Sequence, residues 1–113
     1  MNITFADNKL RKYANDNRLA VRKMGALRAR LYQRRLEDIA DAESFAELKE
    51  LPGNYHQLTE NRKDQWACDL DQPYRLIFEP SEEPIPKDHH GNQILIEIKS
   101  LEILEIENYH KER

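Results

Sequence analysis

The spacing of apolar residues changes at Pro52-Gly53, and this change constrains the fold more than any other feature of the chain. Before it, two apolar stripes follow helical spacing on adjacent faces: Ala20, Met24, Leu27 and Leu31, then Tyr32, Leu36 and Ile39. After it, apolar and polar residues alternate, as in "QWACDL" and "YRLIFE", which is typical of strands with one buried face. The sequence therefore predicts an α+β domain in which a helical half precedes a sheet.

Helix-capping residues, glycine and proline predict where the helices and strands of each half begin and end. "NITFA" at 2–6 predicts a short edge strand, Asp7 and Ser44 predict helix N-caps, and Gly25 predicts a break within the helical half. The predicted sheet strands lie at 54–59, 65–70, 74–79 and 94–107, the last bent at Lys99-Ser100 and buried in the sheet centre. Residues 80–92 contain three prolines, which predicts a polar loop.

Length and cysteine content bound the class of protein. A chain of 113 residues forms one domain, spanning 1–113, with a modest core. Its single cysteine, Cys68, excludes an internal disulfide, which favours a reducing cytosol. The first residues lack the apolar core of a signal peptide and no run approaches the length of a membrane span, so a cytoplasmic protein is expected.

Charge is distributed unevenly along the chain. Between Lys9 and Arg35 there are ten basic residues and one acid, Asp16, whereas residues 36–113 hold eight basic and nineteen acidic ones. The predicted helices therefore offer a basic face to a polyanion or to an acidic partner, or they carry a solvated outer face with no partner.

Five short segments occur in a fixed order: "LPG" at 51–53, "YHQL" at 55–58, "RKDQW" at 62–66, "YRLIF" at 74–78 and "EIENYH" at 105–110. This ordered set resembles the HigB toxins, in the plasmid-maintenance killer subgroup of the RelE/ParE toxin–antitoxin superfamily. The resemblance extends from about Asp7 to His110.

The resemblance implies a RelE-like single domain, with N-terminal helices packed on a curved, mostly antiparallel sheet of about four to five strands. It implies ribosome-dependent cleavage of mRNA, neutralised by a cognate helix-turn-helix antitoxin that also connects the toxin to operator DNA. The toxin would be a monomer alone and a heterotetramer with its antitoxin. By likeness, the functional residues are His56, Arg75, Tyr109 and His110.

Two positions depart from the family pattern. Asn108 stands where an acid usually precedes Tyr-His, and an amide cannot exchange a proton. Thr59 and Asp64 replace the usual Lys and Gly, which leaves fewer cations near the predicted site.

RNA cleavage without a metal needs a general base to remove the 2′-hydroxyl proton and a general acid to protonate the departing 5′-oxygen. It also needs cations to stabilise the charge around phosphorus, and an aromatic ring to stack on a nucleobase. His56 and His110 suit the two proton-transfer roles, in an order that the sequence leaves open. Arg75 suits the phosphorane-like state and Tyr109 suits stacking or orientation. The predicted RNA-binding residues are Arg62, Lys63, Arg22, Lys23, Arg28, Arg30, Arg34, Arg35 and Lys111.

No cofactor or metal is expected. His89 and His90 form an adjacent pair, but they lie in a polar loop without cysteine, which disfavours zinc. Trp66 is expected in the core, with Cys68 packed on the same face rather than acting as a nucleophile.

Alternatives to catalysis remain at this stage. A ParE-like protein would inhibit DNA gyrase by binding, with no use for the histidines, and a degenerate family member would be inactive. At the residue level, Tyr109 also fits an aromatic that closes the core, and His56 and Arg75 fit solvated positions on the sheet. The basic helices suit ribosomal RNA and an acidic antitoxin segment equally well.

Overall fold

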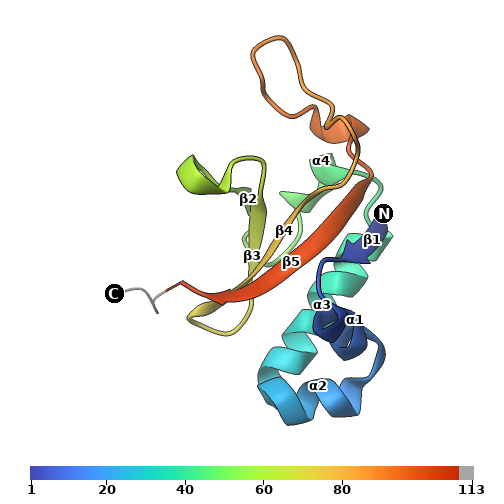
Figure 1. Ribbon diagram of the computed structural model, residues 1–113, viewed down its shortest axis with the longest axis vertical. Coiled ribbons are helices and arrows are strands. Elements are labelled where there is room, and N and C mark those ends of the chain that lie inside the picture. The colour runs from blue at the N-terminus through green and yellow to red at the C-terminus, as the bar shows by residue number, and fades with distance from the viewer. Residues whose placement is uncertain (110–113) are drawn as a thin grey trace.

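The computed structural model describes residues 1–109, in which four helices pack against an open, five-stranded mixed sheet (Figure 1). The strands are β1 (Asn2–Phe5), β2 (His56–Gln57), β3 (Trp66–Asp69), β4 (Tyr74–Pro80) and β5 (Ser100–Asn108). Their order is β1-β5-β4-β3-β2, and only the β1–β5 pair is parallel. The predicted α+β class, with a mostly antiparallel sheet of this size, is confirmed.

The helices follow the sequence prediction at three positions: the N-caps Asp7 and Ser44 and the break at Gly25. They are α1 (Asn8–Asn15), α2 (Asn17–Met24), α3 (Ala26–Asp41) and the single-turn α4 (Phe45–Leu48). The Asp7 carboxylate accepts a hydrogen bond from the Lys9 amide, and the Ser44 hydroxyl accepts one from the Ala46 amide, so both predicted N-caps are confirmed. Gly25 separates α2 from α3 with a φ of +89°, a backbone conformation that favours glycine.

The core lies between the sheet and the helices. Trp66, Phe78 and Phe45 are fully buried, and the Phe45 ring meets the other two edge-on at centroid distances of 5.3 and 5.9 Å. The indole of Trp66 donates a hydrogen bond to the Gln93 side chain, which satisfies its only polar group. Cys68 is buried in the same core, where burial raises the pKa of its thiol to about 12, in agreement with the predicted packing role.

The strand predicted at 94–107 begins only at Ser100, so its first part is a wrong prediction. Leu95–Glu97 instead forms a 3₁₀ turn, η2, before the chain enters β5. Pairing starts late because neither neighbouring strand extends further at this end of β5: β1 begins at Asn2, which pairs with Ser100, and β4 ends at Pro80, which pairs with Leu101. Directly after this turn, Ile98 is buried and its carbonyl accepts a hydrogen bond from the Phe45 amide of α4. Ile96, within the turn, is 68% exposed. The first part of the apolar run therefore contacts α4 and does not pair in the sheet.

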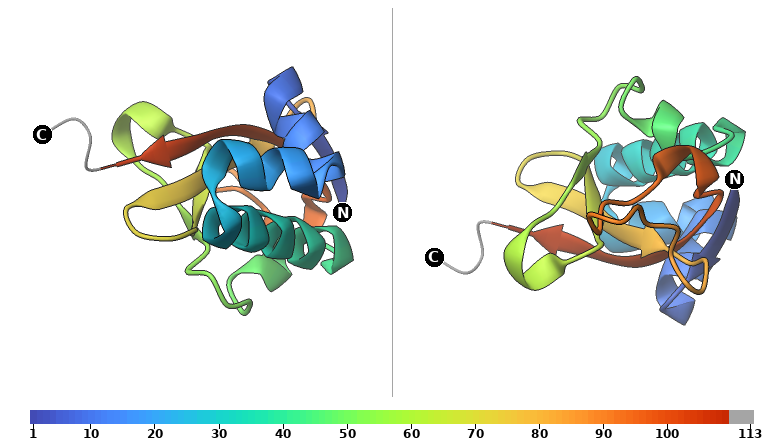
Figure 2. Two further views of the ribbon diagram at one scale, coloured as in Figure 1. Left: turned by 90° about the horizontal axis from the view of Figure 1, so that it is seen from below. Right: turned by 90° about the horizontal axis from the view of Figure 1, so that it is seen from above.

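A second layer partly covers the face of the sheet opposite the core. A short 3₁₀ helix, η1 (Glu60–Arg62), lies on the other side of β3 from α1–α3 (Figure 1). Ala67 and Ile77 point to this face, yet both are fully buried. Figure 2 shows the helices gathered on one side, while the end of β5 extends away from them. The space between η1 and that end of β5 contains three of the predicted site residues, Arg62, Arg75 and Tyr109.

Candidate functional site

An open pocket of 610 Å³ lies between the η1 segment, the start of β4 and the end of β5. Its lining residues are Leu58, Thr59, Asn61, Arg62, Gln65, Arg75, Glu107 and Tyr109. Three of these, Arg62, Arg75 and Tyr109, are site residues predicted from the sequence. The fold therefore brings together, on one surface, residues that are up to 47 positions apart in the chain (109 minus 62).

Glu107 holds the two arginines of this pocket. Arg75 Nε donates to one carboxylate oxygen at 2.7 Å, and Arg62 donates to the other. Arg62 also donates to Glu105 at 3.1 Å. Burial alone would raise the pKa of Glu107, but the hydrogen bonds and charge of Arg75 and Arg62 outweigh it and lower the pKa below its ordinary value. The pocket thus contains two cations in fixed positions, and carboxylates offset their charge.

Tyr109 lies over Arg75 at the end of β5. The guanidinium carbon is 4.9 Å from the ring centroid, within the range of a cation–π contact. The Tyr109 hydroxyl donates to the Gln72 side chain at 3.2 Å, and its amide donates to the Pro73 carbonyl at 3.4 Å. With 38% of the residue exposed, the ring is not a core aromatic, and one face of the arginine–tyrosine pair belongs to the pocket.

The turn between β3 and β4 that holds Tyr109 is itself tied to α3. Arg28 makes a two-point ion pair with Asp71, at 2.9 and 3.1 Å, and its guanidinium lies 3.4 Å from the centroid of the Tyr74 ring. The Tyr74 amide donates to the Asp71 carbonyl, which closes the turn. Arg28, predicted to bind RNA, therefore makes contacts within the fold that position the turn.

Of the other basic helical residues, two make contacts within the fold and three are exposed on the helices. Arg35 donates from Nε to the Asp69 carbonyl at 2.8 Å and packs against Gly53, where a Cβ would lie 2.8 Å from that nitrogen. Arg34 pairs with Asp38 at the surface. Arg22, Lys23 and Arg30 are exposed on α2 and α3, away from the pocket lining.

The remaining predicted site residues do not join the pocket within the described residues. His56 lies on β2 opposite Ala67, and its Nδ1 is 2.8 Å from the Asn54 carbonyl oxygen. Neither His56 nor Lys63 lines the pocket. His110 and Lys111 lie outside the residues that the structure describes, so the pairing of His56 with His110 stays a prediction.

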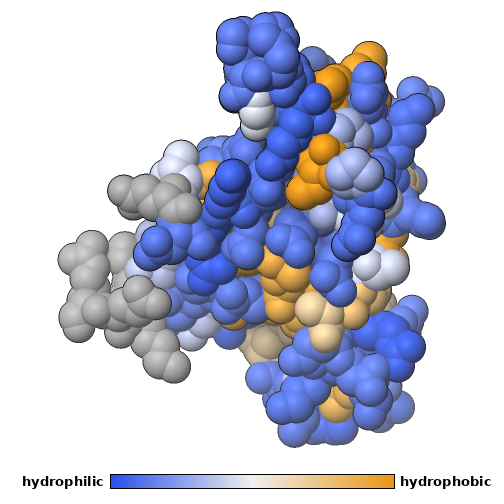
Figure 3. Space-filling model, turned by 45° about the horizontal axis from the view of Figure 1, so that its top comes forward, coloured by the Kyte–Doolittle hydropathy of each residue, from blue (hydrophilic) through white to orange (hydrophobic). Residues whose placement is uncertain are grey.

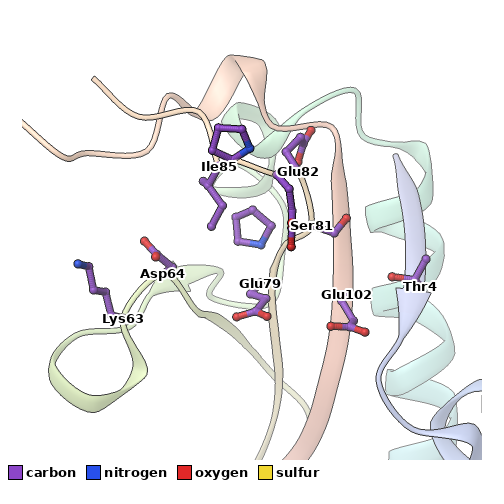
Figure 4. Close-up of a pocket in the computed structure, with 11 residues that line it drawn as sticks. Thr4, Lys63, Asp64, Glu79, Ser81, Glu82, Ile85 and Glu102 are labelled. Atoms are coloured by element: carbon purple, nitrogen blue, oxygen red, sulfur yellow. The ribbon is translucent and has the colours of Figure 1, made fainter. Parts of the chain in front are cut away.

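Lys63 instead lines a second, acidic pocket of 430 Å³ beside the start of β5 (Figure 4). Glu79 and Glu102 face each other there across β4 and β5, and burial together with the charges of Glu102 and Asp64 raises the pKa of Glu79. Asp64 accepts hydrogen bonds from Lys87 and Gln93. Among residues 1–109, no group of three or more His, Cys, Asp or Glu side chains is arranged to hold a metal ion.

Sequence reasoning missed Glu105 and Glu107. The signal was present, because the two acids alternate with apolar residues in "LEILEIE" and therefore share one face of β5. Register then places Glu107 opposite Arg75 and Glu105 opposite Ile77. Arg62 could not have been placed from such a pattern, since it reaches the sheet from the η1 turn.

Comparison with known protein families, with curated proteins and with solved structures finds no match for this chain. The surface seen in Figure 3 is mostly hydrophilic, with apolar residues in smaller areas between polar ones. In the part of the chain that is described, no helix combines the length and the apolar character needed to cross a membrane.

Proposed function

We propose that this protein is a type II toxin that cleaves mRNA on the ribosome and is neutralised by a helix-turn-helix antitoxin. One observation carries the proposal: Arg62, Arg75 and Tyr109 line one pocket at the end of β5, and Tyr109 directly precedes His110 in the sequence. Two guanidinium groups and an aromatic ring are the parts that hold a phosphate and an unstacked base. The resemblance to HigB toxins supplies the substrate class.

In the proposed reaction, the 2′-oxygen attacks phosphorus as a base removes its proton, and the 5′-oxygen leaves with a proton from an acid. The products are a 2′,3′-cyclic phosphate and a 5′-hydroxyl. Arg75 stabilises the charge that builds up on the phosphoryl oxygens. Its Nε is directed to Glu107, which orients the guanidinium so that its Nη donors can serve a phosphate. Tyr109 stacks on a base, and His110 acts as acid or base.

Glu107 orients Arg75 but also weakens the binding of a phosphate in the pocket. It shares its carboxylate between Arg62 and Arg75, and Glu105 adds a second acid beside Arg62. A phosphate entering the pocket must therefore compete with carboxylates for guanidinium donors. Weak binding of free RNA is the consequence, and delivery of the message by the ribosome offsets it.

The test is to induce the protein in cells and map mRNA 5′ ends for the wild type, Arg75→Ala and His110→Ala. His90→Ala, in an exposed loop, is the matched histidine control. We expect new ends within translated frames for the wild type and the control, and a loss of about 100-fold or more for the two site variants. Unchanged cleavage in folded Arg75→Ala and His110→Ala proteins would overturn the catalytic assignment.

A second candidate function is inhibition of DNA gyrase by binding alone. It is favoured by the carboxylates that engage both arginines and by the absence of His56 from the pocket lining. The same experiment separates the two, because a gyrase inhibitor leaves messages intact and triggers DNA-damage signalling.

A further inference from the structure

The two ring nitrogens of His56, a predicted proton-transfer residue, have different surroundings. Nδ1 lies 2.8 Å from the carbonyl oxygen of Asn54, two residues earlier in the chain. A carbonyl oxygen only accepts hydrogen bonds, so Nδ1 must carry the proton in this contact. In the neutral ring the other nitrogen, Nε2, then has a lone pair and is an acceptor. In the part of the chain that the structure describes, Nε2 has no hydrogen-bond partner of its own.

The Asn54 carbonyl is held in place by the residues on either side of it. Asn54 has a φ of +56°, in the left-handed region that asparagine adopts more readily than most residues. Before it, the Gly53 carbonyl accepts a hydrogen bond from the Asp69 amide of β3 at 2.8 Å. After it, Tyr55 is 5% exposed and belongs to the core. The backbone at Asn54 is therefore fixed between two anchored neighbours and presents a fixed acceptor to His56.

Strand register places His56 on the face of the sheet that carries the candidate site. His56 pairs with Ala67 on β3, and Ala67 pairs with Ile77 on β4. Paired residues, and residues two apart in a strand, share a face, so His56 and Arg75 project from the same side. Leu58, two residues after His56, lines the pocket itself. β2 and β4 are two strand spacings apart, roughly 10 Å, which leaves room for a nucleotide between the His56 and Arg75 side chains.

We propose that Asn54 is a positioning residue for the RNA cleavage proposed above, on which this inference rests. Its carbonyl holds His56 in the Nδ1–H tautomer, so that Nε2 is the base that removes the 2′-hydroxyl proton. The 2′-oxygen forms its bond to phosphorus, and the bond from phosphorus to the 5′-oxygen breaks as that oxygen takes a proton from the acid. The role of acid then falls to His110.

The tautomer decides between the two roles that a histidine can take. A neutral ring with its proton on Nδ1 has no proton to donate at Nε2, so at that atom His56 can only act as a base. Once Nε2 has taken the proton, the ring is an imidazolium and both nitrogens are donors. The bond from Nδ1 to the Asn54 carbonyl is then charge-assisted, which stabilises the product of the proton transfer.

Substitutions at Asn54 separate the position of the carbonyl from the asparagine side chain. Asn54→Gly keeps the carbonyl in place, because glycine adopts a positive φ without strain. Asn54→Val displaces it, because a β-branched residue disfavours that region. Asn54→Ala is the milder form of the same change, used where the valine variant does not fold. Gln57→Val is the matched control, since it adds valine at an exposed position of β2. Thermal unfolding checks the fold of each variant.

The first measurement does not depend on activity. Proton–nitrogen correlation spectra of the full chain, recorded with neutral histidines, identify the tautomer of each ring. We expect the Nδ1–H form of His56 in the wild type, Asn54→Gly and Gln57→Val, and a mixture of both tautomers in Asn54→Val. His89 and His90 are exposed internal references, whose ring nitrogens have no carbonyl partner among residues 1–109. A mixture of tautomers at His56 in the wild type would overturn the proposal.

The second measurement is single-turnover cleavage of mRNA on programmed ribosomes, with either oxygen or sulfur at the bridging 5′ position. A thiolate leaves without an acid, so sulfur rescues the loss of the acid but not the loss of the base. We expect Asn54→Gly within about twofold of the wild type, Asn54→Val slower by about tenfold or more on both substrates, and His56→Ala by about 100-fold or more on both. His110→Ala should be rescued by sulfur.

Two results of the cleavage assay would overturn the role given to Asn54 and His56. One is rescue of His56→Ala by sulfur, and the other is wild-type cleavage by an Asn54→Val protein whose His56 tautomers are mixed. A wild type that cleaves neither message would overturn the proposed function and the base role with it, whatever the spectra show.

Discussion

At the scale of single residues, Glu107 decides the electrostatics of the candidate site. Its side chain is 14% exposed and it receives hydrogen bonds from both Arg62 and Arg75. Without this carboxylate, two guanidinium groups would repel each other in the pocket at the end of β5. Glu107 therefore stabilises the folded chain while reducing the positive charge available to a phosphate.

This arrangement predicts a dependence of stability on pH. Because the pKa of Glu107 is lower in the folded chain than its ordinary value, the carboxylate contributes stability that is fully present above the ordinary value of about 4.3. That stability is lost as the pH falls through the folded-state pKa. Burial would raise the pKa of Asp64, but its hydrogen bonds with Lys87 and Gln93 and the charge of Lys87 lower it. Asp64 therefore changes the stability with pH in the same direction as Glu107. We expect the free energy of unfolding to decrease between about pH 5 and about pH 3.

Urea unfolding at several pH values measures the effect, with Glu107→Gln as the variant and the exposed Glu97→Gln as its control. Glu107→Gln should lower the free energy of unfolding at neutral pH by about 1–3 kcal/mol and flatten its pH dependence. The control should match the wild type. A pH profile for Glu107→Gln as steep as that of the wild type would contradict the role given to this carboxylate.

Single-residue signals in the sequence located some features well and missed others. Asp7 and Ser44 mark helix starts because capping is a local interaction, satisfied within two residues. Arg75 stands out in an apolar strand. Glu107 was not recognised, because its importance depends on strand register, and Arg62 depends on the path of a turn that no periodicity describes.

At the scale of elements, the β3–β4 turn connects the helical layer to the candidate site. Arg28 of α3 binds Asp71, and the next two residues of the turn, Gln72 and Pro73, receive hydrogen bonds from Tyr109. The position of the aromatic ring over Arg75 is therefore set partly by a helix on the opposite side of the sheet. Arg28 is a positioning residue in this scheme.

Replacing Arg28 by Ala is expected to loosen the turn without unfolding the chain. The ion pair is about one-fifth exposed, so its loss should cost about 1–2 kcal/mol. The Tyr109 amide, which donates to Pro73, should exchange its hydrogen faster, as measured by amide exchange in NMR spectra. Arg34→Ala, which removes an exposed pair, is the matched control. Equal exchange rates at Tyr109 in both variants would show that Arg28 does not position it.

In the apolar run at 94–107, the spacing of apolar residues did not predict where the strand begins. Its first part has as many aliphatic residues as its second, yet only residues from Ser100 onward find strands to pair with. Ile98 is buried beside α4 and Ile96 faces solvent, an arrangement set by tertiary contacts. Local pattern alone cannot distinguish a strand from an apolar turn of this kind.

At the scale of the whole molecule, the first and last strands close the fold. β1 pairs in parallel with β5, and the Thr4 hydroxyl donates to the Leu101 carbonyl at 3.3 Å, across 97 positions of sequence. The helical residues Tyr32, Leu36 and Ile39 belong to the same core as Trp66 and Phe78. Neither layer buries its apolar face without the other, which is the condition for cooperative folding.

Cooperative unfolding is therefore expected, and the chain provides its own probe. Trp66 is the only tryptophan and is fully buried between layers, so its fluorescence reports the sheet–helix contact, while far-UV circular dichroism reports mainly the helices. The two signals should give the same urea midpoint, with a slope of about 1–2 kcal/mol per M for a domain of this size. If the dichroism of the helices were lost at a lower urea concentration than the fluorescence change, α1–α3 would form a separate unit.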